Sequence, residues 1–209
     1  MWQQLHRILA RVISSLFSVS LNAVFVSSAS GHLGMRLDDL KKTDLFTWFH
    51  LQQTTIEQDR QDQRVVTFKP EGEKFRPVTT IKMTLAQDSQ VSTLELLLSR
   101  SFVDHGRDGM FARDIAKTFL YTLIPREDQG AITDLANEIE YHCPEDMQVL
   151  PLARRRPEVL LPTVPTPGYQ VFLGKRQLYE QILSRCTLTL ENLQDESGTS
   201  LRITLQIKL

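Results

Sequence analysis

The sequence contains little cysteine or glycine and has no excess of charge of either sign. Its 209 residues include 2 cysteines and 9 glycines, and 24 basic residues against 25 acidic residues leave a formal net charge of −1. Without an excess of positive charge there is no long-range field to attract nucleic acid, so we expect no nucleic-acid partner. The glycines nowhere take the spacing of a dinucleotide-binding or phosphate-binding loop, which removes the usual signals of a nucleotide cofactor.

Motifs of metal centres and of serine hydrolases are also missing. The sequence has no Cys-x-x-Cys and no Gly-x-Ser-x-Gly. The histidines after the N-terminal segment include no pair at the i, i+4 spacing of a helical zinc site: His32, His50, His105 and His142. We expect no metal and no cofactor, and the lack of a catalytic motif favours a non-catalytic protein over an enzyme. With 41% hydrophobic and 23% charged residues, the composition is that of an ordinary folded protein.

The N-terminal segment shows the order of an export signal. Basic residues up to Arg11 precede an uncharged run from Val12 to Val26, and no acidic residue occurs before Asp38. Serines interrupt this run, and its apolar core is shorter than the ~20 residues that span a bilayer. Residues 27–31 are small and suit signal peptidase. We predict a signal peptide over residues 1–30.

Cleavage of this leader within 28–31 would leave residues 31–209 as a single exported domain, periplasmic or secreted. The alternative is that residues 8–27 are retained as a membrane-anchoring helix, and we expect membrane contact only in that case. An exported chain with two cysteines has the option of one disulfide. Joining Cys143 to Cys186 would close a loop of about 40 residues and stabilise the fold by about 3–4 kcal/mol. Two buried thiols are the alternative.

Alternation of apolar and polar residues predicts the strands of an antiparallel sheet. Three predicted strands follow one another with short turns between them: Arg64–Phe68, Val78–Leu85 and Val91–Arg100. Two more, Thr187–Leu193 and Leu201–Leu209, flank the turn-forming residues 194–199. This last pair predicts a C-terminal hairpin with one face on the core.

A period of about 3.6 residues predicts two main helices. The clearest stripe recurs at every fourth residue between Gly109 and Pro125: Phe111, Ile115, Phe119 and Leu123. A second helix is predicted from about Asp128 to His142. Glu138 in the second helix is expected to face solvent, and Arg113 in the first helix is likewise expected on a solvated face.

Three remaining segments are less regular. Residues 37–58 predict short helical pieces, and the polar stretch Gln58–Gln63 predicts a solvated turn or an exposed strand edge. The proline density of residues 144–168 predicts a connecting loop without a helix or a central strand. The segment Lys175–Arg185 predicts a short helix. Together these elements predict an α+β domain in which an antiparallel sheet of about five strands, a meander plus the C-terminal hairpin, packs two main helices on one face.

The densest cluster of functional residue types lies between the third predicted strand and the first main helix. Asp104, His105 and Asp108 are residues of the kind used in general acid–base catalysis. Arg107, beside the free amides of the helix start, would suit a phosphate or a carboxylate. The structural alternative is a turn into the helix, with Asp108 as its N-cap and with Gly106 and Gly109 at positive φ.

A basic run lies among the prolines, where Arg154, Arg155 and Arg156 are adjacent. Such a run would contact an acidic partner, an anionic lipid head group or a polysaccharide carboxylate. The alternative is a solvated loop, because three charges screened by salt contribute modestly to binding.

Three hypotheses about function follow. The leading one is an exported, non-catalytic envelope or periplasmic protein that binds another macromolecule, with the partner unknown. The second is a small-ligand or lipid-binding domain around Phe111, Phe119 and Tyr121. The third is a hydrolase with its site near Asp104 and His105.

Overall fold

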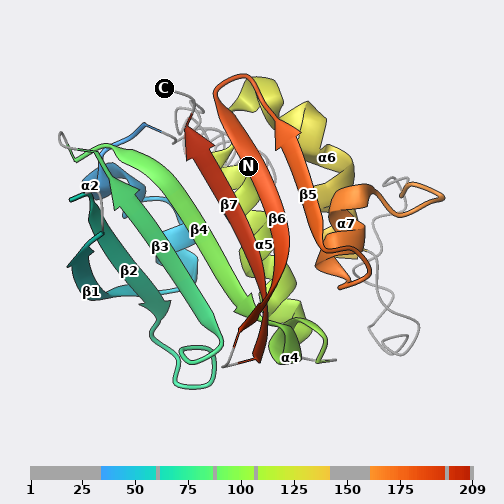
Figure 1. Ribbon diagram of the computed structural model, residues 1–209, viewed down its shortest axis with the longest axis horizontal. Coiled ribbons are helices and arrows are strands. Elements are labelled where there is room, and N and C mark those ends of the chain that lie inside the picture. The colour runs from blue at the N-terminus through green and yellow to red at the C-terminus, as the bar shows by residue number, and fades with distance from the viewer. Residues whose placement is uncertain are drawn as a thin grey trace, which may run out of the picture. The chain divides into compact units, whose positions relative to one another are not determined.

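A computed structural model describes the chain over residues 34–59, 62–86, 89–105, 108–141, 161–195 and 198–207. Its strands form one seven-stranded sheet in the order β1-β2-β3-β4-β7-β6-β5 (Figure 1). The strands are β1 (Leu51–Gln58), β2 (Arg64–Pro70), β3 (Thr79–Leu85), β4 (Val91–Ser99), β5 (Leu178–Ile182), β6 (Cys186–Asp195) and β7 (Gly198–Ile207). The helices are α2 (Leu37–Leu40), α3 (Asp44–Trp48), α4 (Arg100–Val103), α5 (Gly109–Leu123), α6 (Arg126–Tyr141) and α7 (Pro167–Phe172).

The predicted fold class is confirmed, since one antiparallel sheet carries the helices, but the sheet has seven strands where the sequence predicts about five. The meander β1–β4 and the hairpin β6–β7 are both present, and every neighbouring pair of strands is antiparallel. β7 lies between β4 and β6, in the interior of the sheet. The predicted leader lies outside the described residues.

One additional strand is β1, and here the prediction of helical pieces through residue 58 is wrong. The helical pieces end with α3, and His50 turns the chain with a φ of 45°, so that β1 begins at Leu51. The branched β-carbons of Thr54 and Thr55 favour extended backbone, and β1 pairs with β2 along its length. Because β1 is an edge strand with no fully buried side chain, its sequence lacks the alternation that marks a half-buried strand.

The other additional strand is β5, where the sequence predicts a helix over Lys175–Arg185. Leu178 and Ile182 are four residues apart, and this spacing places two side chains on one side of a helix. Because four is an even number, the same spacing also places them on one side of a strand. Pairing with β6, in which Leu178 lies opposite Glu191, determines that the segment is extended.

The core lies between one face of the sheet and the helices, and Figure 1 shows α5 and α6 behind the sheet. Alternate strand residues such as Ile81 and Met83 of β3 are fully buried against the helices. The predicted stripe of α5 is confirmed, because Ile115, Phe119 and Leu123 are fully buried. Among the described residues, no helix combines the length and the apolar composition needed to cross a membrane.

Two charged residues that the sequence places in solvent are buried instead. Arg113 of α5 and Glu138 of α6 retain exposed fractions of 7% and 1%. The Arg113 guanidinium donates to the carbonyl oxygen of Ile139 at 3.0 Å and to the hydroxyl of Tyr169 at 3.2 Å. The Glu138 carboxylate accepts hydrogen bonds from the backbone N–H of Thr166, at 2.9 Å, and from its hydroxyl. The prediction fails because the partners of both residues include a segment remote in the sequence.

That segment is α7, whose first two residues, Pro167 and Gly168, overlap the end of the predicted loop 144–168. Residues 161–166 of this loop are not helical, as predicted, and its earlier part lies outside the described residues. Pro167 occupies the first helical position, where an N–H would have no intrahelical partner. The Thr166 hydroxyl caps the helix by accepting from the N–H of Tyr169 at 3.3 Å. Arg100 of α4 donates to the carbonyl oxygen of the last residue of α7 at 2.7 Å. Buried polar groups of α4, α5 and α6 therefore fix α7.

Candidate functional site

The predicted cluster between β4 and α5 is built as a turn. The Asp104 carboxylate pairs with the Arg100 guanidinium, and Asp108 pairs with the ammonium of Lys74 at 2.6 Å. Asp108 occupies the N-cap position of α5, as predicted, but its side chain forms no hydrogen bond with a helix N–H. His105 is exposed, and within the described part of the chain its side chain has no hydrogen bond to either carboxylate. The described residues of this cluster do not form an acid–base pair.

Gly109 is required by close packing and not by the predicted positive φ. A Cβ at Gly109 would lie 2.7 Å from the carbonyl oxygen of Val103, which is closer than real Cβ contacts. The described glycines with positive φ are Gly34, Gly174 and Gly198. The tight turn from α4 into α5 therefore explains this glycine.

Several predicted site residues lie outside the described part of the chain: Gly106, Arg107, Cys143, Arg154, Arg155 and Arg156. Cys186 is buried in β6, and the disulfide stays a prediction. Phe119 is fully buried, Phe111 stacks on Phe75 with ring centroids 3.9 Å apart, and Tyr121 is half-buried. These aromatic rings pack as core residues do. Over the described ranges, no group of three or more His, Cys, Asp or Glu side chains is placed to hold a metal ion.

The sheet face that points away from the helices carries a row of polar side chains, and at its β5 edge it also carries the exposed Leu178 and Ile182. Lys82 of β3 lies opposite Thr67 of β2 and Glu95 of β4. Glu95 lies opposite Thr204 of β7, which lies opposite Thr189 of β6. Such a row is expected when one face of an antiparallel sheet packs on the core and the other faces water. We call this surface, formed by the outward-facing residues of β1–β7, the open face.

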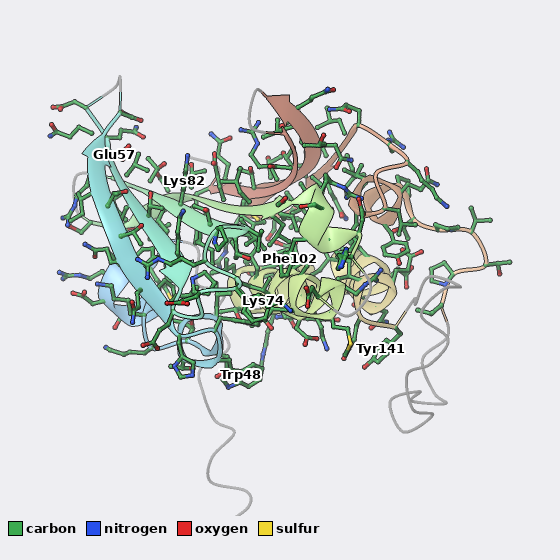
Figure 2. The ribbon with its side chains drawn as sticks, turned by 90° about the horizontal axis from the view of Figure 1, so that it is seen from below. Trp48, Glu57, Lys74, Lys82, Phe102 and Tyr141 are labelled. Atoms are coloured by element: carbon green, nitrogen blue, oxygen red, sulfur yellow. The ribbon has the colours of Figure 1, made fainter. Side chains whose placement is uncertain are left out.

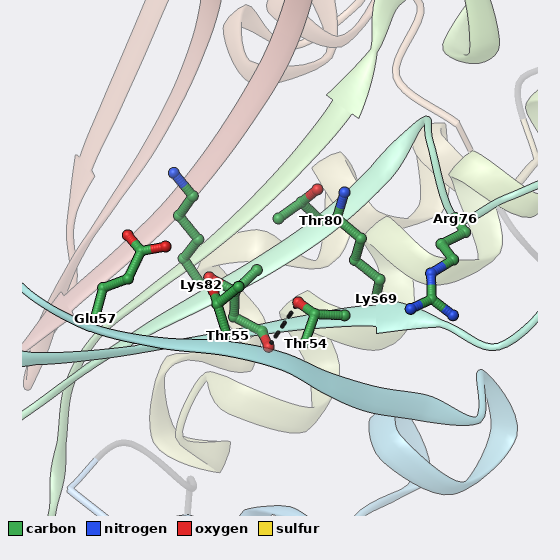
Figure 3. A pocket seen from close by; sticks show the side chains of 8 residues that line it. Thr54, Thr55, Glu57, Lys69, Arg76, Thr80 and Lys82 are labelled. Carbon is green, nitrogen blue, oxygen red and sulfur yellow. Dashed lines mark hydrogen bonds between the residues drawn. The ribbon is translucent and has the colours of Figure 1, made fainter.

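A groove of about 470 Å³ lies on the open face across β1, β2 and β3 (Figure 3). We call it the β1–β3 groove. Its lining residues are Thr54, Thr55, Glu57, Thr67, Lys69, Arg76, Thr80 and Lys82. Figure 2 shows Lys82 and Glu57 on the side of the sheet away from Phe102. The groove therefore lies on the opposite side of the sheet from the core.

A β-bulge in β1 places two consecutive hydroxyl groups in the groove. Gln53 pairs with Phe68 and Thr55 pairs with Thr67, so that Thr54 is an extra residue without a partner of its own in β2. In a regular strand, consecutive side chains point to opposite faces, whereas Thr54 and Thr55 both line the groove. The Thr54 hydroxyl donates to the carbonyl oxygen of Thr67 at 3.2 Å. The bulge is thus part of the construction of the groove.

Three basic side chains of the groove lack carboxylate partners. Lys69 is half-buried, while Arg76 and Lys82 are exposed. Across the described part of the chain, none of these three forms an ion pair. Elsewhere on the open face, Arg202 of β7 pairs with Glu191 of β6 at 2.5 Å. Because these three side chains form no ion pair, an incoming anion would not have to break one, although Glu95 of β4 lies opposite Lys82 in the sheet.

The charged side chains follow one another along the groove in a fixed order. Figure 3 shows Glu57 at one end, then Lys82 and Lys69, and Arg76 at the other end. Glu57 is the single acidic residue of the described lining. The groove therefore has a polarity, with one negative end followed by three positive side chains.

The chemistry of the lining favours oxygen anions. Lysine and arginine donate charge-assisted hydrogen bonds to carboxylate and phosphate oxygens, and threonine hydroxyls both donate and accept. The described lining includes no aromatic side chain. Stacking on aromatic rings is a main source of affinity for single-stranded nucleic acids. The groove is thus better suited to anionic groups than to bases.

The sequence gives only a weak signal for this groove. Lys69, Arg76 and Lys82 are separated by other residues and belong to β2, to the loop after it, and to β3. Lys82 is visible in the sequence as a polar residue of a predicted alternating strand. The missing information is the pairing of β1 with β2, since the sequence predicts no strand there.

The comparisons with protein families, curated proteins and solved structures give no match for this chain. The fold and the groove together define a class, an α+β domain with one seven-stranded sheet whose open face carries a basic groove. Function is therefore inferred from the open face itself.

Proposed function

We propose that this protein is a non-catalytic binding protein that acts outside the cytosol and holds an anionic macromolecule of the cell envelope in the β1–β3 groove. The observation that carries the proposal is the set of three unpaired cations, Lys69, Arg76 and Lys82, in a groove lined with threonine hydroxyls. The export signal predicted over residues 1–30 supports the location.

The form of the groove supports a macromolecule over a small molecule. Sites for small ligands bury most of the ligand surface in a concave, largely apolar pocket. The β1–β3 groove instead lies open on a sheet face and has a polar and charged lining. An extended polymer would contact it with part of its length, and each charge contact would be individually weak because it is exposed to solvent.

The groove cations give the proposal a direct test. We expect poly-glutamate, used as a generic polyanion, to bind the protein at about 50 mM salt and to bind much more weakly at about 300 mM salt, because exposed charges are screened. The variant Lys69→Gln/Arg76→Gln/Lys82→Gln should lose this binding. A matched variant, Lys41→Gln/Arg126→Gln/Lys175→Gln, removes the same charge outside the groove and should keep it. Equal loss in both variants would show that binding follows net charge alone.

The predicted location is tested separately. The intact mass of protein recovered from the envelope fraction of its own host should lack about 30 N-terminal residues. A full-length mass would instead support the retained anchor at residues 8–27. The same measurement under non-reducing conditions distinguishes a Cys143–Cys186 disulfide from two thiols, because the disulfide lowers the mass by about two hydrogens.

A further inference from the structure

The order of the charged residues along the β1–β3 groove indicates which kind of anionic ligand fits there. We infer that the groove binds an extended acidic peptide segment whose carboxylates occur on alternate residues and are preceded by a basic residue. This inference rests on the proposed function, since it names the ligand class of the same groove.

Spacing is the first argument. Lys82 lies opposite Thr67, and Lys69 lies two residues further along β2. Two residues along a strand span about 6.6–6.8 Å, and neighbouring strands are about 4.8 Å apart, so the two lysines start about 8 Å apart. In an extended peptide, side chains on alternate residues point the same way and are also about 7 Å apart. Flexible lysine side chains accommodate the small difference.

The negative end of the groove is the second argument. Glu57 precedes the three cations along the groove (Figure 3). A polymer with uniform negative charge, such as a nucleic acid or a polyuronate, would place a like charge beside Glu57. Like charges in proximity cost binding energy. A peptide can carry a basic residue at that position and acidic residues beyond it, so its charges match the order of the charged residues that line the groove.

The threonines are the third argument. The threonines that line the groove are Thr54, Thr55, Thr67 and Thr80. The hydroxyls of Thr55, Thr67 and Thr80 can donate to carbonyl oxygens, and all four can accept from amide N–H groups, while the Thr54 proton is already donated to the carbonyl oxygen of Thr67. An extended peptide exposes both kinds of group along its length. β1 is also the edge of the sheet. Its bulge at Thr54 disrupts the regular ladder and disfavours addition of another strand. The peptide is therefore expected to lie on the open face and not to extend the sheet.

The test uses two peptides of identical composition, Lys-Ser-Glu-Ser-Glu-Ser-Glu and Lys-Ser-Ser-Ser-Glu-Glu-Glu, each labelled for fluorescence anisotropy. We expect the alternating peptide to bind about 5-fold more tightly, because each exposed ion pair that is lost costs up to about 1 kcal/mol. Replacing the peptide lysine by serine should weaken binding to the wild-type protein and should have a smaller effect on Glu57→Gln. Lys82→Gln should remove the preference for the alternating peptide, while Lys175→Gln should retain it.

The outcomes separate this inference from the proposed function. Equal affinity for the two peptides would overturn the inferred pattern and leave the proposed function standing, provided that poly-glutamate still binds at the groove. If a single-stranded oligonucleotide binds at the groove more tightly than the alternating peptide, the inference that the ligand is a peptide is wrong. If neither the peptides nor poly-glutamate nor the oligonucleotide binds at low salt, the proposed function fails together with the inference.

Discussion

Gly109 and Gly130 both lie in helices, but their surroundings are opposite. A Cβ at Gly109 would lie 2.7 Å from a carbonyl oxygen, whereas nothing lies within 4 Å of a Cβ at Gly130. We expect Gly109→Ala to lower the free energy of unfolding by about 1–3 kcal/mol because the backbone must shift. Gly130→Ala should raise it by about 0.5–1 kcal/mol, because alanine favours helix. Urea denaturation measures both, and changes of the same sign would contradict the described turn.

The buried carboxylate of Glu138 accepts hydrogen bonds from the backbone N–H and from the hydroxyl of Thr166. Glu138→Ala removes the acceptor and leaves the N–H and hydroxyl of Thr166 without it, so we expect a loss of about 2 kcal/mol in the free energy of unfolding. Asp134→Ala, at an exposed position of the same helix, is the control and should change it by less than about 0.5 kcal/mol. A comparable effect of the two substitutions would mean that Glu138 does not anchor α7.

Two tyrosines should titrate above their ordinary value of 10.0. Burial raises the pKa of Tyr121, with Glu140 adding to the effect, and burial raises the pKa of Tyr179, with Arg176 opposing it. A folded-state pKa above the unfolded value means that the stabilising contribution is complete below pH 10 and is lost as pH rises through the folded pKa. The phenolate absorbance of the folded protein should therefore appear at higher pH than that of the unfolded chain.

The corresponding substitutions check the assignment. In Tyr121→Phe and Tyr179→Phe the urea midpoint should fall less between about pH 9 and about pH 11 than it does in the wild type. The Tyr179 hydroxyl donates a hydrogen bond to Gln181 at 2.7 Å, and Tyr179→Phe removes this bond as well. The variants are therefore compared by how far the urea midpoint falls between the two pH values, and not by the midpoint itself. An unchanged pH dependence in both variants would argue against the raised pKa values.

At the scale of elements, β6 and α7 are joined by one buried side chain. The Asn192 amide donates to the carbonyl oxygens of Val171 at 2.9 Å and Arg176 at 2.8 Å. Asn192→Ala should therefore lower stability by about 1–3 kcal/mol and increase amide hydrogen exchange in residues 167–182. Exchange in β1–β4 should stay unchanged. Gln194→Ala, at an exposed position of the same strand, should change neither region.

The elements that the sequence predicts well are those whose pattern is produced by a single buried face. α5 and the strands β3, β4 and β7 each bury alternate or fourth residues, and their bounds differ from the predicted ones by a few residues at most. The sequence misses β1 and β5 because both are edge strands. Little of their surface is buried, and the intrinsic propensities of their residues do not distinguish a strand from a helix. Thr54 illustrates this limit, since its role in the groove exists only once β1 is paired with β2.

The candidate site is less predictable than the fold for a related reason. The sequence singles out residues 104–108 because chemically versatile side chains are adjacent there, yet adjacency along the chain does not place them in one site. Lys69, Arg76 and Lys82 are ordinary surface cations in the sequence and become a group only through strand pairing and the loop after β2. A site built from cross-strand neighbours has no signature in a single sequence.

At the scale of the whole molecule, the groove charges should contribute to binding and not to stability. Lys69→Thr/Lys82→Thr removes two unpaired cations and introduces residues that favour strands, so the free energy of unfolding should stay within about 0.5 kcal/mol of the wild type or rise. Arg202→Thr is the comparison, because it breaks the ion pair with Glu191 and should not stabilise the fold. Thermal unfolding of both variants measures the difference. A large loss of stability in the double variant would mean that these lysines serve the fold.

The interior position of β7 also bears on the order of events during synthesis. β7 follows all the other described strands in the chain, yet it pairs with both β4 and β6. Until β7 emerges, a nascent chain can form only two partial sheets, and the edges of β4 and β6 that will receive it stay exposed. Closing contacts between residues far apart in sequence is slow, and exposed strand edges invite aggregation. A late central strand would thus keep the sheet from closing before synthesis reaches it.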